Sequence, residues 1–465
     1  MPLILGTNSI KDTGFNVANS CRFDTNASMT KTSSTGSNTK STLSVWVKRS
    51  KLGAEQKIFN FTGGSNNFNI EFKSTDILAV SSYDGSSQMN LRPSRVFRDV
   101  SAWYHIVIAI DTTQGTAANR VKIYVNGVQE SSFGTETYPA EDETIEMNGR
   151  NSTNPFVGQD GGDDKFFNGY LAELVWIDGS QLAADSFGEF DSDSGIWKPI
   201  NVSGLTFGTN GFYLDFEASG NLGNDANGGT DLGETNIAAT DQSIDTCTNN
   251  FVTGNPIAAQ GGSAQSDSLL TFTEGNLLMA ANSETGIATI GVSAGKWYWE
   301  VKVIADQDGL IIGACNEHFN INAELGYNSP SSPSAAKIFG YYGGNGNSMI
   351  VVGDGTSQSY GSAISVNDII GVALDVDSAD QTCTFYLNGS SQGSLDITNL
   401  GSGESYFPAV GNWSVADVST SWNFGSPAFA ISSGNTDGNG YGNFEYAVPS
   451  GYFALNTKNL AEYGG

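Results

Sequence analysis

Three aspartates in the stretch GQDGGDDKFF have side chains that could hold a metal ion. Asp160, Asp163 and Asp164 lie among glycines. Carboxylate oxygens in a flexible loop suit calcium, although this spacing differs from that of an EF-hand. Aspartate is also a common turn residue in its own right. We therefore expect a solvated turn here, with calcium binding by these three residues as the alternative. No motif requires a cofactor.

Aromatic side chains could provide a second kind of chemistry, the binding of a ligand. Tyr341, Tyr342 and Trp413 lie in glycine- and asparagine-rich contexts that are typical of loops. An aromatic face can stack on a sugar ring while nearby Asn and Asp side chains bond to its hydroxyls. The alternative is core packing, because aromatic residues supply much of the buried surface of a protein. These three residues are the ligand-binding candidates.

The residues that catalysis needs are sparse. Of the two histidines, His105 lies inside the apolar run AWYHIVIAID and His318 in a loop-like stretch. The sequence contains no HExxH or P-loop motif. Glu173 and Asp178 are five positions apart, which puts them on opposite faces of a regular strand. We expect a protein that is not an enzyme.

Charge and hydropathy exclude two classes of partner. The formal net charge is −28, from 49 acidic and 21 basic residues, and such a surface repels the phosphates of nucleic acids. No stretch approaches the roughly 18 apolar residues that a membrane span needs. The opening MPLILGTNSIKD lacks the basic region of a secretory signal. We expect neither nucleic-acid binding nor membrane insertion.

Four cysteines are too widely spaced to indicate a disulfide scaffold. They are Cys21, Cys247, Cys315 and Cys383. Buried free thiols are the expected state, and pairing of Cys315 with Cys383 is left open.

The elements that position these residues are strands. The segments 120–127 (RVKIYVNG) and 382–389 (TCTFYLNG) alternate apolar and polar residues and end in Asn-Gly, the strongest signal for a two-residue hairpin turn. Each follows an apolar strand, IVIAID or IIGVALD. This shared order predicts an all-β chain with two β-sandwiches of related architecture.

Composition along the chain sets the expected domain limits. Residues 1–200 and 256–465 are rich in strand patterns, whereas much of 201–255 is rich in glycine and acidic residues. We expect a first sandwich with an N-terminal docking segment over 1–200, an ordered connector over 201–255 and a second sandwich over 256–465.

Several motifs resemble known families. Residues 20–190 resemble a laminin G-like, concanavalin A-type jelly roll through LSVWVKRS, AWYHIVIAID, VKIYVNGV and FNGYLAELVWIDG. Residues 256–460 resemble a SPRY domain through GKWYWEVKV, IIGVALDVD, CTFYLNG, YFPAVG and WNFG. Both resemblances imply concanavalin A-like β-sandwiches. Some such sandwiches hydrolyse glycans with carboxylates spaced ExDxxE or ExDxE, a pattern that EDETIE at 141–146 lacks.

The chain as a whole is similar to tail-fibre-like and other virion proteins of tailed bacteriophages, especially marine ones. The matching stretches are VANSCRFD, WVKRSKLGAEQKIF, AATDQSIDTCTNNF and GYFALNTKNL. This resemblance implies an appendage on the exterior surface of the virion, on tail or head, that attaches to the host surface. Glycans are the candidate receptors, and homo-oligomers would multiply weak contacts.

Other virion proteins are the expected partners of the N-terminal segment around MPLILG. The alternatives are a purely structural capsid decoration or assembly protein, and a glycan hydrolase.

Overall fold

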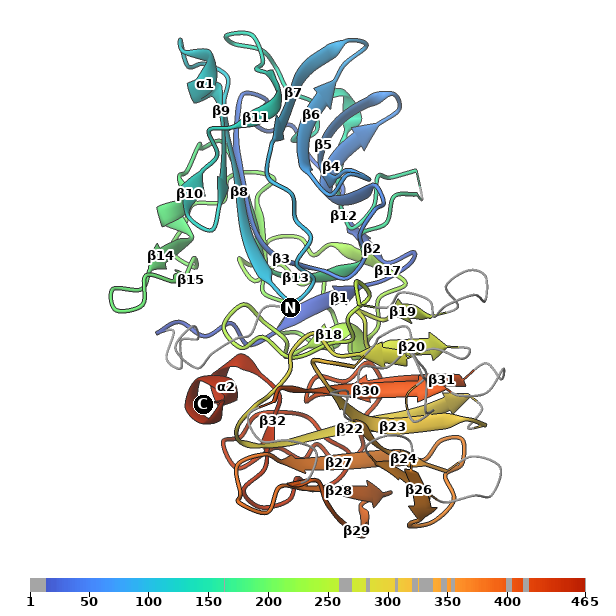
Figure 1. The fold of residues 1–465 in the computed structure, drawn as a ribbon. Helices are drawn as coiled ribbons and strands as arrows, with labels where there is room; N and C mark the ends of the chain where they lie inside the picture. The colour runs from blue at the N-terminus through green and yellow to red at the C-terminus, as the bar shows by residue number, and fades with distance from the viewer. Residues whose placement is uncertain are drawn as a thin grey trace. The chain divides into compact units, whose positions relative to one another are not determined.

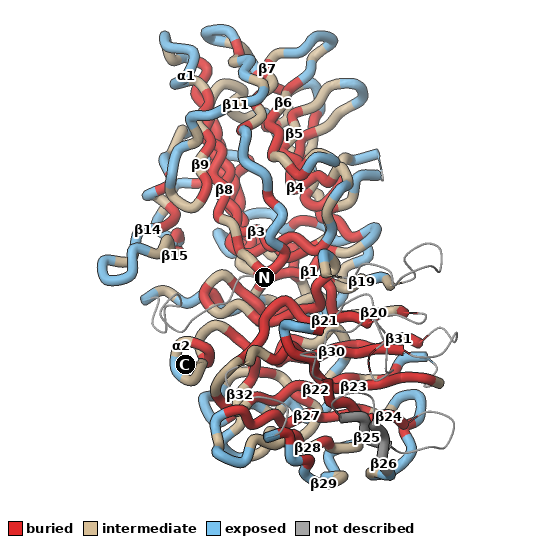
Figure 2. Tube along the Cα trace, in the orientation of Figure 1, coloured by how far each residue is buried: buried red, intermediate tan, exposed pale blue. Residues whose placement is uncertain are grey.

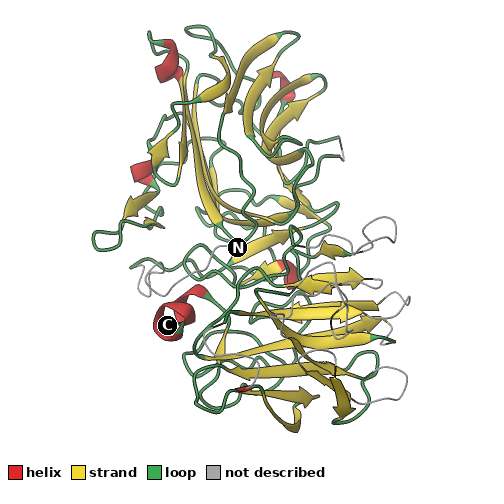
Figure 3. Cartoon of the chain, in the orientation of Figure 1, coloured by secondary structure: helices red, strands yellow, loops and turns green. Residues whose placement is uncertain are grey.

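Strands make up 44% of the structure and helices 5%, which confirms the all-β fold class (Figure 3). The structure is a computed structural model that describes residues 14–162, 164–258, 270–281, 285–305, 308–319, 325, 338–343, 349–352, 356–398, 404–412 and 418–464. The described chain folds into two compact units, one within residues 12–248 and the other within residues 249–465. No helix in these ranges is long and apolar enough to cross a membrane.

The first unit is a sandwich of two sheets (Figure 1). One sheet has the order β10 (Val128–Gln129), β9 (Val121–Val125), β8 (Trp103–Asp111), β3 (Lys40–Arg49), β13 (Gly169–Asp178), β1 (Ser20–Phe23), β18 (Gln242–Ser243), and β16 (Phe212–Leu214) pairs with β13. The other has the order β11 (Phe133–Thr137), β7 (Ser87–Pro93), β6 (Leu78–Tyr83), β5 (Asn66–Phe72), β4 (Gln56–Gly63), β12 (Asn154–Val157), β2 (Ser28–Thr30), β17 (Gly233–Thr235). The remaining elements are β14 (Gly188–Phe190), β15 (Trp197–Pro199), α1 (Ala117–Arg120), η2 (Arg150–Ser152), η3 (Ala184–Ser186) and η4 (Ala239–Asp241).

The core of the first unit lies between these two sheets, along the buried strand segments in Figure 2. Trp176 of β13 is fully buried, and its ring centroid lies 5.0 Å from that of Phe59 and 5.2 Å from that of Phe61, both on β4. Alternate residues of each strand enter this core, because successive side chains point to opposite faces of a sheet. The other alternate residues form the outer faces.

A bulge in β4 changes that alternation at one place. The register with β5 shifts between Lys57 and Phe59, and Ile58 and Phe59 are both buried in the core. The extra residue allows Lys57 and Asn60 to share the outer face, although residues three apart in a regular strand face opposite ways.

Residues 201–255 do not form a separate connector between the domains. β16 pairs with β13, β17 with β2 and β18 with β1, so short strands tie this stretch to the sheets of the first unit, which includes it up to residue 248. Leu222 and Leu232, from its glycine-rich part, are buried in the core. The composition of this stretch is typical of a loop, but some of its residues are buried in the core of the first sandwich. The division between the units falls at residue 248.

The second unit also contains two sheets. One has the order β19 (Thr271–Thr273), β20 (Leu278–Ala281), β31 (Val418–Asn423), β22 (Lys296–Ala305), β27 (Ile369–Asp375), β28 (Thr382–Leu387), β29 (Ser390–Asp396), and β32 (Phe453–Ala454) pairs with β22. The other has the order β21 (Thr285–Ile287), β30 (Tyr406–Asn412), β23 (Leu310–Asn316), β24 (Ile338–Tyr342), β25 (Met349–Val352), β26 (Thr356–Ser359). Helix α2 (Thr457–Tyr463) ends the unit, and its N-cap Asn456 accepts a hydrogen bond from the backbone N–H of Asn459.

The two Asn-Gly turns occupy equivalent positions in the two units, as the sequence predicts. Asn126 and Gly127 have φ of 47° and 78°, and Asn388 and Gly389 have 48° and 77°. Each asparagine Oδ1 also accepts a hydrogen bond from a backbone N–H of the preceding strand, at 2.8 Å in the first unit and 2.9 Å in the second. Each asparagine thus forms the turn of its hairpin and also bonds to the strand that precedes the hairpin, β8 in the first unit and β27 in the second.

The cysteines are free thiols, as expected. Cys21, Cys315 and Cys383 are buried, and Cys247 is partly buried. Cys315 lies in β23 and Cys383 in β28, which belong to different sheets and different core clusters.

Candidate functional site

Tyr341 and Tyr342 do not lie in a loop, so the expected placement of these two ligand-binding candidates is wrong. Both belong to strand β24 and are buried, with 0% and 4% of their surfaces exposed. The Tyr341 ring packs against Tyr360 and Phe385, and its hydroxyl accepts a hydrogen bond from the Ser362 backbone N–H at 3.0 Å. Neither ring offers a face to a sugar. Trp413 lies outside the described residues.

Asp160 and Asp164 form a turn whose contacts fit the solvated-turn interpretation. Asp160 Oδ1 accepts hydrogen bonds from the backbone N–H of Gly162 at 2.8 Å and of Asp164 at 3.4 Å. The ammonium of Lys165 lies 3.5 Å from Asp160 Oδ2 and 3.9 Å from Asp164 Oδ1. A lysine in that position opposes a second cation. Asp163 lies outside the described residues, and within them no group of three or more acidic, His or Cys side chains could hold a metal.

His105 has a structural role in the first unit. Its Nδ1 accepts a hydrogen bond from Trp197 Nε1 at 2.9 Å, and its Nε2 lies 2.8 Å from Ser44 Oγ. Its ring stacks on Trp46 at 4.7 Å. Burial lowers the pKa of His105 to about 3. A neutral, enclosed imidazole of this kind has no route to a substrate.

The two carboxylates of β13 also make structural contacts. Asp178 accepts hydrogen bonds from the backbone of Ser37 and from Asn148 Nδ2. Glu173 lies at a bulge in β13, has a φ of 47° and accepts a hydrogen bond from the Tyr213 hydroxyl at 2.6 Å. Burial raises the pKa of Glu173 to about 7.

A pocket of about 570 Å³, which we name the β4–β5 pocket, lies on the outer face of the second sheet of the first unit. The sequence did not reveal it. Strands β4, β5 and β12 and the turns around residues 63–65 and 160–165 line it. Its polar and aromatic lining comprises the amides Asn67, Asn69 and Asn154, the hydroxyls Thr62, Ser65 and Ser152, the ring of Phe156, and the charged Lys57, Lys165 and Asp160.

Strand register brings the pocket residues together. Thr62 of β4 pairs with Asn67 of β5 on one side and Asn154 of β12 on the other. One row further along the strands, Asn60 pairs with Asn69 and Phe156. Directly opposed residues point to the same face of a sheet. Amides and an aromatic ring from three strands therefore share one surface.

Asn60 is the most unusual residue of this surface. Only 1% of it is exposed, and neither its Oδ1 nor its Nδ2 has a hydrogen-bond partner within the described part of the chain. A buried polar group left without a partner costs about 1–3 kcal/mol. Its two neighbours in the row, Asn69 and Phe156, line the pocket. Asn60 itself does not line the pocket, so its buried amide lies beneath the surface that Asn69 and Phe156 form.

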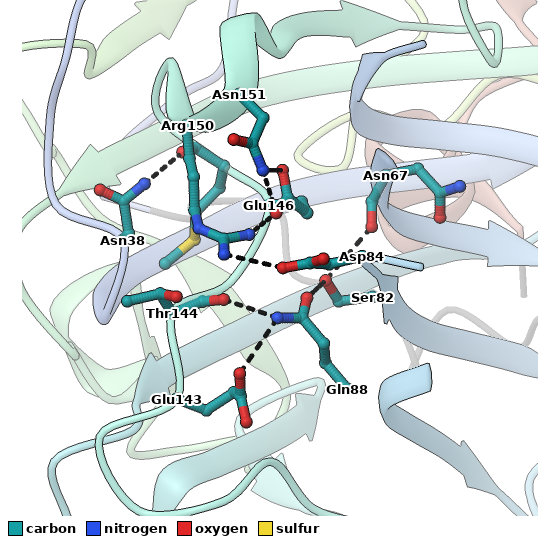
Figure 4. Close-up of polar contacts among 11 residues, drawn as sticks. Asn38, Asn67, Ser82, Asp84, Gln88, Glu143, Thr144, Glu146, Arg150 and Asn151 are labelled. Atoms are coloured by element: carbon teal, nitrogen blue, oxygen red, sulfur yellow. Dashed lines mark hydrogen bonds and ion pairs between the residues drawn. The ribbon is translucent and has the colours of Figure 1, made fainter. Parts of the chain in front are cut away.

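A polar network holds the wall of the β4–β5 pocket that carries Ser152 (Figure 4). Arg150 forms ion pairs with Glu146 and, at 2.7 Å, with Asp84 in the turn after β6. Asn151 donates a hydrogen bond to Glu146 at 2.9 Å. These contacts fix η2 against the hairpin of β6 and β7, and η2 ends at Ser152.

A second set of polar contacts reaches β5. Gln88 donates hydrogen bonds to the backbone carbonyl of Thr144 at 2.7 Å and to Glu143 at 3.2 Å, and it accepts one from Ser82. The Ser82 hydroxyl also lies 3.2 Å from the carbonyl of Asn67 (Figure 4). Polar contacts thus hold both the wall and the floor of the pocket, which favours a pre-formed site.

The wall of the pocket formed by Asp160, Gly161, Gly162 and Lys165 is a tight turn, and its backbone conformation restricts which residues can occupy it. Gly161 has a φ of 77°, and a Cβ there would overlap the methyl group of Thr62. Lys165 has a φ of 52°, in the left-handed region that non-glycine residues rarely adopt. The backbone carbonyl of Lys165 accepts a hydrogen bond from the Lys57 N–H at 2.9 Å. This bond fixes the turn to the bulge of β4.

Comparison with protein families confirms both domain classes. Residues 23–185 match the model of the concanavalin A-like lectin/glucanases superfamily, and residues 296–425 match that of the SPRY domain. The chain therefore carries a concanavalin A-like domain followed by a SPRY domain, two classes that suggest a binding module. No curated protein matches the chain.

Several solved structures are similar to part of the chain. The SPRY domain of human HERC1 is 14% identical, with a TM-score of 0.28 and coverage of 36% of this chain and 96% of that one. Domain 4 of the arabinanase AbnA from Geobacillus stearothermophilus, in complex with arabinotriose, is 18% identical, with a TM-score of 0.25 and coverage of 31% and 64%. A heptameric SAP-like pentraxin from Limulus polyphemus is 15% identical, with a TM-score of 0.28 and coverage of 36% and 80%.

Proposed function

We propose that this protein is a non-enzymatic binding protein that holds a saccharide in the β4–β5 pocket of its first unit. The observation that carries the proposal is the lining of the pocket, in which amides, hydroxyls and the ring of Phe156 come together from three strands and two turns. Amides and hydroxyls bond to sugar hydroxyls, and an aromatic ring covers the apolar face of a sugar. The contacts of Glu173, Asp178 and His105 support a non-enzymatic role.

The biological setting in which the protein binds a saccharide is part of the same proposal. The resemblance to phage virion proteins supports an appendage on the exterior of a tailed phage that attaches to a host-surface glycan. Other virion proteins would hold the segment around MPLILG, which lies outside the described residues. Several copies in one particle would turn weak pocket contacts into firm attachment.

Oligosaccharide binding to the purified full chain tests the proposal. Screening on a glycan array, followed by calorimetry with the best ligand, should give measurable affinity. Asn69→Ala and Phe156→Ala should each weaken it by about tenfold, equivalent to one lost contact of about 1.4 kcal/mol. Asn119→Ala, a change of the same type at an exposed position on α1, is the matched control. Equal affinities for all four proteins would contradict the assignment of the pocket.

The enzymatic alternative has its own readout. Incubation of the protein with a bound polysaccharide should release no reducing ends. Release that survives repurification would replace the binding role with glycan hydrolysis.

A further inference from the structure

The charged side chains that line the β4–β5 pocket have partners of opposite charge. Lys57 pairs with the buried Glu71, and the ammonium of Lys165 lies 3.5 Å from Asp160 and 3.9 Å from Asp164. Opposite charges this close largely cancel each other's field at a ligand. A neutral ligand therefore suits this lining, and the groups that can distinguish one neutral ligand from another are its amides.

Asn67 and Asn69 present a hydrogen-bond donor and an acceptor to the pocket as a fixed pair. They are two positions apart on β5 and therefore share a face. Asn69 Nδ2 donates a hydrogen bond to Asn67 Oδ1 at 2.7 Å. This bond uses one atom of each amide, so Asn67 Nδ2 and Asn69 Oδ1 remain at the two outer ends of the pair. Rotating both amides by half a turn would exchange the ends and would still leave one donor and one acceptor.

This pattern is complementary to a secondary amide. The N–H and C=O of a trans amide point in opposite directions, so its N–H can donate to Asn69 Oδ1 while its C=O accepts from Asn67 Nδ2. A sugar hydroxyl carries its donor and its acceptor on a single oxygen and meets one end of the pair. The pair therefore favours a sugar with an acetamido group over the same sugar with a hydroxyl in that place.

The rest of such a sugar would lie across β4 toward β12. Asn154 Oδ1 accepts a hydrogen bond from the Ser33 N–H at 2.9 Å, which leaves Asn154 Nδ2 as a donor for a ring hydroxyl. Phe156 lies two strands from Asn69 in the same row, which is about 9–10 Å at the usual strand spacing. One N-acetylated sugar residue can span this distance with its apolar face on the ring of Phe156.

We propose that the β4–β5 pocket selects an N-acetylated amino sugar, and that the Asn67–Asn69 pair determines this specificity by bonding to its acetamido group. The inference rests on the proposed saccharide binding. The acetamido N–H donates to the acceptor end of the pair, and the acetamido C=O accepts from the donor end. A sugar with a hydroxyl in place of the acetamido group loses one of these two contacts and binds more weakly.

Two pairs of neutral probes test this proposal on the full chain. Within each pair, one sugar has acetamido groups where the other has hydroxyls: chitotriose with cellotriose, and methyl N-acetyl-β-galactosaminide with methyl β-galactoside. Calorimetry should show that the acetamido probe binds about tenfold more tightly in at least one pair, which is the effect of about one net hydrogen bond. Raising the salt concentration should leave the preference unchanged, because the probes are neutral.

Two variants assign the preference to the Asn67–Asn69 pair. Asn67→Asp can still accept the hydrogen bond from Asn69, but it replaces the donor end of the pair with a second acceptor. The tenfold preference should therefore disappear. Asn119→Asp, the same change at an exposed position on α1, is the matched control and should retain the preference. Thermal unfolding of each variant verifies that it is folded.

The outcomes separate this inference from the proposed function. If the acetamido probes bind no more tightly than the hydroxyl probes, if they fail to bind while a glycan of the array binds, or if Asn67→Asp keeps the preference, selection by this pair is refuted and saccharide binding stands. If none of the four probes and no glycan of the array binds, the proposed function fails and this inference fails with it.

Discussion

Replacing Glu173 with glutamine should flatten the pH dependence of the stability of the first unit. The carboxyl lies at the bulge of β13, is 7% exposed and accepts a hydrogen bond from Tyr213 at 2.6 Å. Burial is the main cause that raises its pKa from 4.5 to about 7, and Asp215 and Glu217 act in the same direction. Glutamine keeps the shape and the acceptor oxygen, and it does not titrate.

The sign and size of the effect follow from proton linkage. Between pH 4.5 and about 7 the folded chain keeps the Glu173 proton, whereas the unfolded chain has lost it. The free energy of unfolding therefore falls as pH rises through this window. At 1.36 kcal/mol per pKa unit, the difference amounts to roughly 3 kcal/mol.

Hydrogen exchange of peptides from β13 and β16, measured between pH 5 and pH 8, reads the stability of this unit directly. After correction for the intrinsic exchange rate, the wild type should lose roughly 3 kcal/mol more than Glu173→Gln across the range. Glu136→Gln, at an exposed glutamate of β11, is the control and should follow the wild type. Parallel curves for wild type and Glu173→Gln would refute the reasoning.

Three further predictions concern other buried contacts of the first unit. Arg150→Ala removes the ion-pair partner of the fully buried Glu146, and urea unfolding should show a loss of about 3 kcal/mol that adding Glu146→Gln partly restores. Gly127→Ala places a Cβ at a φ of 78° and against the ring of Trp197, which should cost at least ~2 kcal/mol in the same assay; a wild-type midpoint would contradict that close approach. His105, with its pKa lowered to about 3 by burial, should keep a neutral ring with the proton on Nε2 from pH 8 to pH 5, and a titrating His105 signal in NMR spectra would show that the ring is not enclosed.

The elements that were predicted from residues adjacent in the sequence agree with the structure. The Asn-Gly turns at 126–127 and 388–389 adopt the positive φ values that this dipeptide favours. The alternation around them gives the strands, and the motifs give both domain classes. A turn is decided by the conformational preferences of two residues, so the sequence is sufficient to predict it.

Burial and strand pairing required the tertiary structure. The run IFGYY reads as loop-like beside its glycines, yet Tyr341 and Tyr342 lie in a strand whose two faces are both covered. The glycine-rich stretch after residue 201 reads as a connector, yet its short strands pair with β1, β2 and β13. These outcomes depend on which distant strand lies alongside, and local composition does not encode that choice.

The β4–β5 pocket illustrates the same division between sequence and tertiary structure. The alternation of NNFNIEF was sufficient to predict that Asn67 and Asn69 share a face opposite Phe68 and Ile70. Only the pairing of β12 with β4 brings Phe156 beside Asn60, and only the turn after β12 adds Lys165. Alternation determines which face a side chain occupies, because it is a property of one strand. The partners across that face are decided by long-range register, a property of the whole sheet.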